Sequence, residues 1–82
     1  MAIDYSEERA VLKSVVTIQE VDDLQEWLIA HPQGEIDLEG CEHLHTAALQ
    51  TLTSAQRTIS AWPSDGSLRG WIEPLLTKQE AQ

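Results

Sequence analysis

Residues 35–52, EIDLEGCEHLHTAALQTL, decide the fold because they place a strand, a bend and a helix in succession. Apolar and polar side chains alternate over residues 35–38, which predicts a short strand. Residues 39–40 predict a bend, and residues 41–45 fit either extended chain or a loop. From Thr46 onward apolar residues recur at helical spacing. The buried stripe of this helix should comprise Ala48, Leu49, Leu52, Ala55 and Ile59.

The chain before this stretch predicts another strand and another helix. Residues 10–16 contain a β-branched run long enough for one strand. Thr17 and Glu20 have the spacing of a capping box, in which each side chain bonds the other residue's free backbone amide. The helix that follows should end at residues 31–34, HPQG, because a proline disfavours helical geometry in the residue before it. Its apolar stripe comprises Val21, Leu24 and Leu28, with Trp27 beside them.

The chain after the stretch repeats the alternation. Residues 58–62 predict a third strand, which the turn residues 63–66, PSDG, should end. The last helix carries the stripe Leu68, Ile72, Leu75 and Leu76, and Pro74 should kink or restart it because proline has no amide hydrogen. The order β-α-β-α-β-α predicts the α/β class, with a small mixed, mainly parallel β-sheet and helices packed on it.

The length of the chain bounds its organisation. A chain of 82 residues accommodates one small domain, so we expect a single domain over residues 1–82. Residues 1–8 are polar and predict a loose N-terminal arm, in which residues 3–5 offer a further strand. Residues 78–82 predict a frayed tail.

Acidic residues dominate the charge. Fourteen Asp and Glu against five Lys and Arg give a formal charge of −9. Such a field repels phosphate backbones and anionic lipid, so it argues against nucleic acid and membrane surfaces and favours a basic protein partner. Cys41 is the single cysteine, so no intrachain disulfide can form. No secretory signal pattern or apolar run of ~20 residues is present, so we expect a cytoplasmic protein without membrane insertion.

Two segments of the deciding stretch, IDLEG at 36–40 and HTAALQ at 45–50, resemble the signature of the STAS family, which is named after sulfate transporters and anti-sigma-factor antagonists. Members carry a strand ending in Asp-Leu-Ser-Gly or similar, and then Asp-Ser or Asp-Thr at the start of a leucine-rich helix. The Thr-Ala-Ala-Leu-Gln variant is similar to that of small bacterial STAS proteins encoded near chemotaxis genes. The resemblance implies a sheet with helices packed on one face.

The resemblance also implies a function in binding, with no catalysis and no cofactor. In classical members an anti-sigma-type kinase phosphorylates the Ser or Thr at the helix start, and the phosphate changes which protein the domain binds. That residue maps to Thr46 here. Other members are small cytoplasmic regulatory subunits of a transporter ATPase. The family's acidic residue before the phosphoacceptor is His45 in this chain, which favours the second, unphosphorylated alternative.

A hydroxyl at a helix start suits a switch, because free amides and the helix dipole stabilise negative charge there by ~0.3–1 kcal/mol for exposed groups. The alternative for Thr46 is an ordinary helix N-cap. We expect the partner, a kinase, another signalling component or an ATPase, to contact the loop 39–46 and the exposed face of the next helix. The predicted phosphorylation site is Thr46, and the predicted partner-binding residues are Gly40, His43, His45, Thr46, Ala47, Gln50 and Thr53.

A metal or thiol site at Cys41, His43 and His45 is the remaining alternative. The three residues alternate, so in an extended chain they point to one face and offer thiolate and imidazole ligands. Structural zinc sites normally show two paired ligand clusters, which this segment lacks. No third group orients a catalytic Cys–His pair either. We therefore expect neither a metal site nor an enzyme, and interpret Cys41 as a small buried hydrophobe.

The three tryptophans are interpreted as core residues, since each buries a large area. Trp27 borders the first helical stripe, Trp62 lies in the third strand and Trp71 borders the last stripe. For Trp71 the alternative is a dimer or partner contact together with Pro74 and Leu75, because tryptophan is favoured in binding hot spots.

Overall fold

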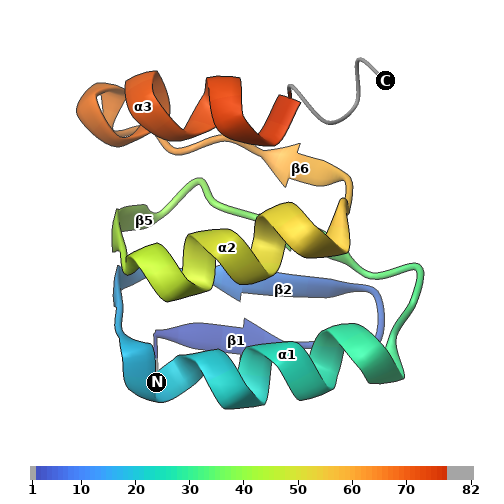
Figure 1. The fold of residues 1–82 in the computed structure, drawn as a ribbon. Coiled ribbons are helices and arrows are strands. Elements are labelled where there is room, and N and C mark those ends of the chain that lie inside the picture. The colour runs from blue at the N-terminus through green and yellow to red at the C-terminus, as the bar shows by residue number, and fades with distance from the viewer. Residues whose placement is uncertain (1, 78–82) are drawn as a thin grey trace.

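Strands and helices alternate along the chain in the computed structural model, which describes residues 2–77 (Figure 1). The strands are β1 (Ile3–Tyr5), β2 (Arg9–Leu12), β3 (Ser14–Val16), β4 (Glu35–Asp37), β5 (Cys41–Leu44) and β6 (Ile59–Ala61). The helices are the short 3-10 helix η1 (Ile18–Glu20), α1 (Val21–Ala30), α2 (Thr46–Ala55) and α3 (Gly66–Thr77).

The strands form a four-stranded and a two-stranded sheet in which most pairings are parallel, and this confirms the predicted α/β class. One sheet has the order β1-β2-β4-β6, in which β1 is antiparallel to β2 and the other two pairings are parallel. A second, two-stranded sheet pairs β3 with β5 in parallel. Figure 1 shows α1 and α2 side by side in front of the strands, with α3 next to α2. The helices therefore cover one face of the sheet.

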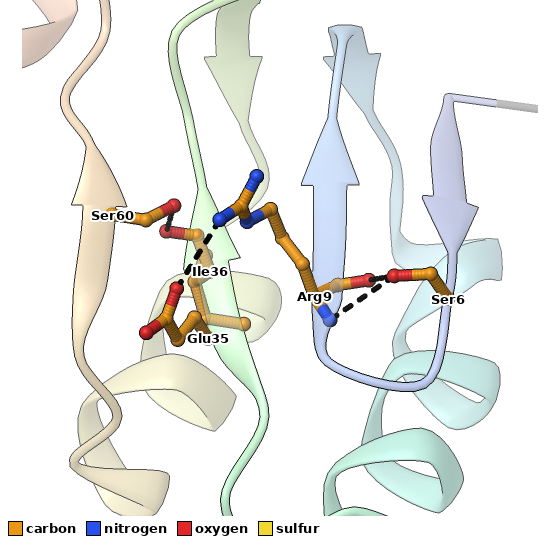
Figure 2. Close-up of polar contacts among 5 residues, drawn as sticks. All are labelled: Ser6, Arg9, Glu35, Ile36 and Ser60. Carbon is orange, nitrogen blue, oxygen red and sulfur yellow. Dashed lines mark hydrogen bonds and ion pairs between the residues drawn. The ribbon is translucent and has the colours of Figure 1, made fainter.

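The face that the helices leave uncovered carries polar side chains (Figure 2). Arg9 of β2 forms an exposed ion pair with Glu35 of β4 at 3.5 Å, and the Ser6 hydroxyl donates to the Arg9 carbonyl at 3.0 Å. The Ser60 hydroxyl of β6 donates to the Ile36 carbonyl at 3.3 Å. In-out alternation along the strands explains this distribution, because the neighbouring residues point to the helices.

The core lies between the sheet and the helices and follows the predicted stripes with two exceptions. Ile59, expected in the stripe of the middle helix, lies in β6 because α2 ends at Ala55, and Leu75, expected in the last stripe, is exposed. The buried side chains of the core come from all three α-helices and from five of the six strands, whereas η1 and β6 contribute none. The strands and their ends contribute Ile3, Ala10, Leu12, Val16, Ile36, Leu38, Cys41 and Leu44, and the helices contribute Leu24, Trp27, Leu28, Ala48, Leu49, Leu52, Leu68, Ile72 and Leu76. The helical periodicity thus identified most of the buried residues correctly.

The prediction of one strand over residues 10–16 is wrong, because Ser14 interrupts it. Ser14 has a φ of 55°, in the left-handed region that non-glycine residues rarely adopt. Its amide donates to the Gly40 carbonyl at 2.8 Å, at the point where pairing changes from β2–β4 to β3–β5. The break divides the run into β2 and β3.

The N-terminal arm is not loose, because residues 3–5 form β1. Ile3 pairs with Leu12 and is buried, which supplies the apolar contact that orders this segment. The alternative of a further strand at residues 3–5 is therefore the correct one. The predicted frayed tail, residues 78–82, lies outside the described residues.

The last helix does not restart at Pro74, as the sequence suggested it could. α3 continues through Pro74 to Thr77. Pro74 has no amide hydrogen to donate to the Gly70 carbonyl, which would be its partner in a regular helix. Both residues are exposed, so water can hydrate that carbonyl. Within residues 2–77, no helix has the length and apolarity that a membrane span requires.

Candidate functional site

The predicted docking face begins at the bend between β4 and β5, which one local hydrogen bond and two hydrogen bonds from Ser64 hold in place. The Asp37 carboxylate accepts from the Glu39 amide at 2.9 Å. The Glu39 carbonyl accepts from both the amide and the hydroxyl of Ser64, each at 3.1 Å. Gly40 is exposed at this bend, beside the Lys13 side chain. β5 leads from here towards the start of α2, and its four residues span about 13 Å of extended chain.

A bulge at Glu42 sets which side chains of β5 point inward. Ser14 pairs with Cys41, but Val15 pairs with His43, so Glu42 is an extra residue in the β5 strand. Cys41 and Leu44 are consequently both buried, whereas Glu42 and His43 are exposed. The expectation that Cys41, His43 and His45 share one face is therefore wrong, because the bulge breaks the alternation. Within residues 2–77, no group of three metal-ligating side chains is gathered.

The Cys41 thiol is a core group, as interpreted from the sequence. It is 1% exposed, and its sulfur approaches the His43 carbonyl at 3.5 Å. Burial raises the pKa of the Cys41 thiol to about 11. The thiolate is the reactive form of cysteine, so Cys41 is inert at neutral pH.

His45, and not Thr46, caps α2. The imidazole Nδ1 of His45 accepts a hydrogen bond from the Ala47 amide at 3.0 Å. An accepting Nδ1 requires the neutral ring with its proton on Nε2. The prediction of Thr46 as N-cap is wrong because His45 already satisfies a free amide of the first turn, which leaves Thr46 as the first helical residue.

Thr46 is exposed at the start of α2. The remaining free amides and the positive end of the helix dipole lie in this first turn, and they favour negative charge there. α2 itself has no charged side chain, because its sequence is TAALQTLTSA. The exposed hydroxyl thus lies on a helix whose outer face is polar but neutral.

An open groove of about 680 Å³ runs between α2 and α3, and Thr46 is one of its lining residues. Its walls combine hydroxyl and amide groups of α2 with apolar side chains of α3. The lining residues are Thr46, Leu49, Gln50, Thr53, Ser54, Trp71 and Leu75. Three predicted partner-binding residues, Thr46, Gln50 and Thr53, therefore lie on one concave surface.

Trp71 is not a core residue, contrary to the preferred interpretation. It is 46% exposed, and Leu75 one turn later is 45% exposed. The buried side of α3 is filled by Leu68, Ile72 and Leu76. Trp71 directly precedes Ile72 in the chain, so its side chain is rotated by about 100° about the helix axis from that of Ile72. Trp27 is buried, as interpreted. Trp62 follows the end of β6 and is partly buried against the core, so its interpretation as a core residue of the third strand is correct only in part.

A second groove lies between α1 and α2, and Arg57 lies at its end. The Arg57 guanidinium donates to the Leu28 carbonyl at 2.5 Å and the His31 carbonyl at 2.7 Å, near the end of α1. Ala47 and Gln50, both predicted partner-binding residues, also line this groove. Gln50 and Ser54 face both grooves, so they mark the ridge between them.

The sequence interpretation missed Ser54 and the role of Arg57. The helical spacing of Ser54 from Gln50 already places the two on one side of α2, which is the signal that could have identified Ser54. The contacts of Arg57 join segments 23 or more residues apart, and no local pattern indicates them. No protein-family model matches the chain, and no curated protein matches it significantly.

Proposed function

We propose that this protein is a non-enzymatic, STAS-like interaction module of the anti-sigma-factor-antagonist type. The observation that carries the proposal is the position of Thr46, exposed as the first residue of α2 and on the rim of the α2–α3 groove. The STAS-like motif at residues 36–50 and the sheet covered by helices on one face support it. The partner contacts the outer face of α2 and the β5 residues that precede it.

Phosphorylation of Thr46 is the proposed switch. A phosphate there adds roughly −1.5 to −2 charges, which the first-turn amides of α2 accommodate. The helix therefore stays folded while the surface changes. A partner that covers Thr46 with an apolar contact would have to desolvate the phosphate, so modification releases that partner.

The partner in this proposal is an anti-sigma-type kinase or another signalling component in the cytoplasm. Incubation with such a kinase and labelled ATP should add one phosphate, and Thr46→Ala should abolish the labelling. Thr51→Ala is the matched control, because the Thr51 hydroxyl lies on the same helix but donates to the Ala47 carbonyl at 3.0 Å. Labelling that survives Thr46→Ala would refute the switch.

The docking face can be tested without knowing the partner. A photo-crosslinking amino acid at Gln50 should capture a partner protein in the host cell, because Gln50 is exposed on the ridge of α2. The same amino acid at Glu8, exposed in the β1–β2 turn, is the control. Capture from Glu8 alone would show that the docking face is elsewhere.

The second candidate is a constitutive regulatory subunit of a transporter ATPase. It is favoured by His45, which stands where the family has its acidic residue and whose ring is engaged in capping α2. In that case the protein should co-purify with an ATPase subunit to the same extent as wild type, Thr46→Ala and Thr46→Asp. Loss of co-purification in Thr46→Asp alone would favour the switch.

A further inference from the structure

The α2–α3 groove has the composition of a helix-binding surface. Trp71 and Leu75 are one helical turn apart on α3, and both are nearly half exposed. Across the groove, α2 presents Leu49 at the base and short polar side chains at the rim. α2 has 10 residues and is therefore about 15 Å long, which matches two to three turns of an occupant.

The charge of the chain argues against a second copy in this groove. Each copy carries a formal charge of −9, so two copies brought face to face would repel each other. The described basic residues are already counted in this charge, and three of the four form ion pairs within the same chain. Arg9, Lys13 and Arg69 pair with Glu35, Asp4 and Glu73, and Arg57 bonds backbone carbonyls.

The same charge favours a cationic occupant. The groove walls carry no charged side chain, so the electrostatic potential there follows from the acidic chain as a whole, whose formal charge is −9. An occupant with an apolar stripe can fill the space beside Trp71 and Leu75. Basic residues on its flanks would then meet the negative field, which also accelerates association.

We propose that the α2–α3 groove binds an amphipathic helix of a partner protein, with the apolar stripe of that helix against Trp71 and Leu75 and with Lys or Arg on its flanks. This inference rests on the proposed function and specifies its partner. It follows the general mode in which a helix places its apolar face into a hydrophobic groove. The exposed aromatic ring of Trp71 is the central anchor.

The test uses the whole protein and a synthetic helix of Leu and Lys, about 18 residues long so that it can form a helix. A peptide with Glu in place of Lys is the charge control. Amide NMR shifts of the labelled protein map the contact, and titration gives the affinity. The Leu/Lys peptide should shift resonances of Thr46, Gln50, Thr53, Trp71 and Leu75, and should bind at least about tenfold more tightly than the Leu/Glu peptide.

Two groove variants and one control complete the test. Trp71→Ala should weaken Leu/Lys binding by about tenfold or more. Ser54→Lys should weaken it comparably by placing a positive charge in the groove, and because Ser54 is exposed the fold should be kept. Ile29→Ala, at the most exposed large apolar residue, lies on α1 outside this groove and should change the affinity less than about twofold.

Three outcomes would overturn the inference. The first is that the Leu/Lys peptide does not bind, and the second is that the amide shifts it causes are centred away from α2 and α3. The third is that the protein dimerises with rising concentration and that Trp71→Ala abolishes the dimer, which would make a second copy the occupant. The proposed function fails separately. If a partner is crosslinked from Gln50 but the peptide does not bind, the inference of a helical occupant is refuted and the proposed docking face stands. If the peptide binds but no partner is crosslinked from Gln50, the proposed docking face in the cell is refuted.

Discussion

The ring of Trp27 lies so close to Gly34 that a β-carbon at Gly34 would overlap the ring. The same ring stacks on His31 with centroids 4.9 Å apart, and its Nε1 donates to the Ser6 carbonyl at 2.9 Å. The end of α1, the following turn and the β1–β2 turn therefore meet at one tryptophan.

Gly34→Ala should destabilise the protein, because the new methyl group forces Trp27 or the backbone to move. We expect a loss of about 1–3 kcal/mol in the free energy of unfolding, measured by urea denaturation. Gly70→Ala is the matched control, since Gly70 is inside α3 and, apart from its chain neighbours and the backbone of its own helix, no atom lies within 4 Å of a β-carbon there. That change should stabilise the protein by ~0.5–1 kcal/mol. Equal effects of the two changes would contradict the tight contact.

Arg57→Lys should destabilise the protein although it keeps the positive charge. The guanidinium bonds the carbonyls of both Leu28 and His31, whereas one ammonium cannot reproduce the planar fork that makes both bonds. We expect a loss of about 1–3 kcal/mol by chemical denaturation. Arg9→Lys is the control, and because the Arg9–Glu35 pair is exposed, its effect should stay below about 1 kcal/mol. Equal losses would show that charge, not geometry, matters at Arg57.

His45→Ala should lower stability by about 1 kcal/mol, because the Ala47 amide loses its capping acceptor. His45→Asn and His45→Asp should retain most of the stability, since their side-chain oxygens can accept the same bond. Thermal unfolding at neutral pH measures all three variants. If His45→Asn is as unstable as His45→Ala, the imidazole contributes by packing and not as a cap.

Alkaline pH should destabilise the protein through Cys41. Its pKa rises from 9.0 to about 11 on folding, so the unfolded thiol ionises first and stability falls as pH rises through this interval. The stability is fully present below pH 9, where both states hold the proton. Tyr5 acts in the same direction from pH 10 upward, since burial, followed by nearby Asp23 and Glu20, raises its pKa to about 12.

Urea midpoints measured across this pH range should therefore decline in the wild type and decline less steeply in Cys41→Ala. A thiol reagent at pH 8 should modify the native protein far more slowly than the urea-unfolded chain. Fast modification of the native protein would show that Cys41 is accessible.

Periodicity in the sequence predicted the elements that face the core, and contacts between distant residues explain what it missed. The stripes Leu24–Leu28 and Ala48–Leu52 could be predicted because burial repeats with the helical turn. The break at Ser14 and the bulge at Glu42 could not, since each depends on the partner strand. Residue preferences also favoured Thr46 over His45 as the cap, because histidine seldom fills that role.

The candidate site was predicted in part. The exposure of Thr46 and Gln50 followed from their places on a helix whose opposite side is apolar. The α2–α3 groove was not predicted, because it depends on how α3 is rotated against α2. That rotation leaves Trp71 outside the buried stripe.

The extra residue at Glu42 has a consequence for comparing this chain with other sequences. Because Glu42 is an extra residue outside the regular pairing of β5 with β3, we expect a sequence lacking it to keep Cys41 and Leu44 buried and to begin α2 with the same exposed threonine. An alignment with a one-residue deletion in this region should therefore place the gap opposite Glu42. A gap placed inside α2 would match Thr46 to the wrong residue.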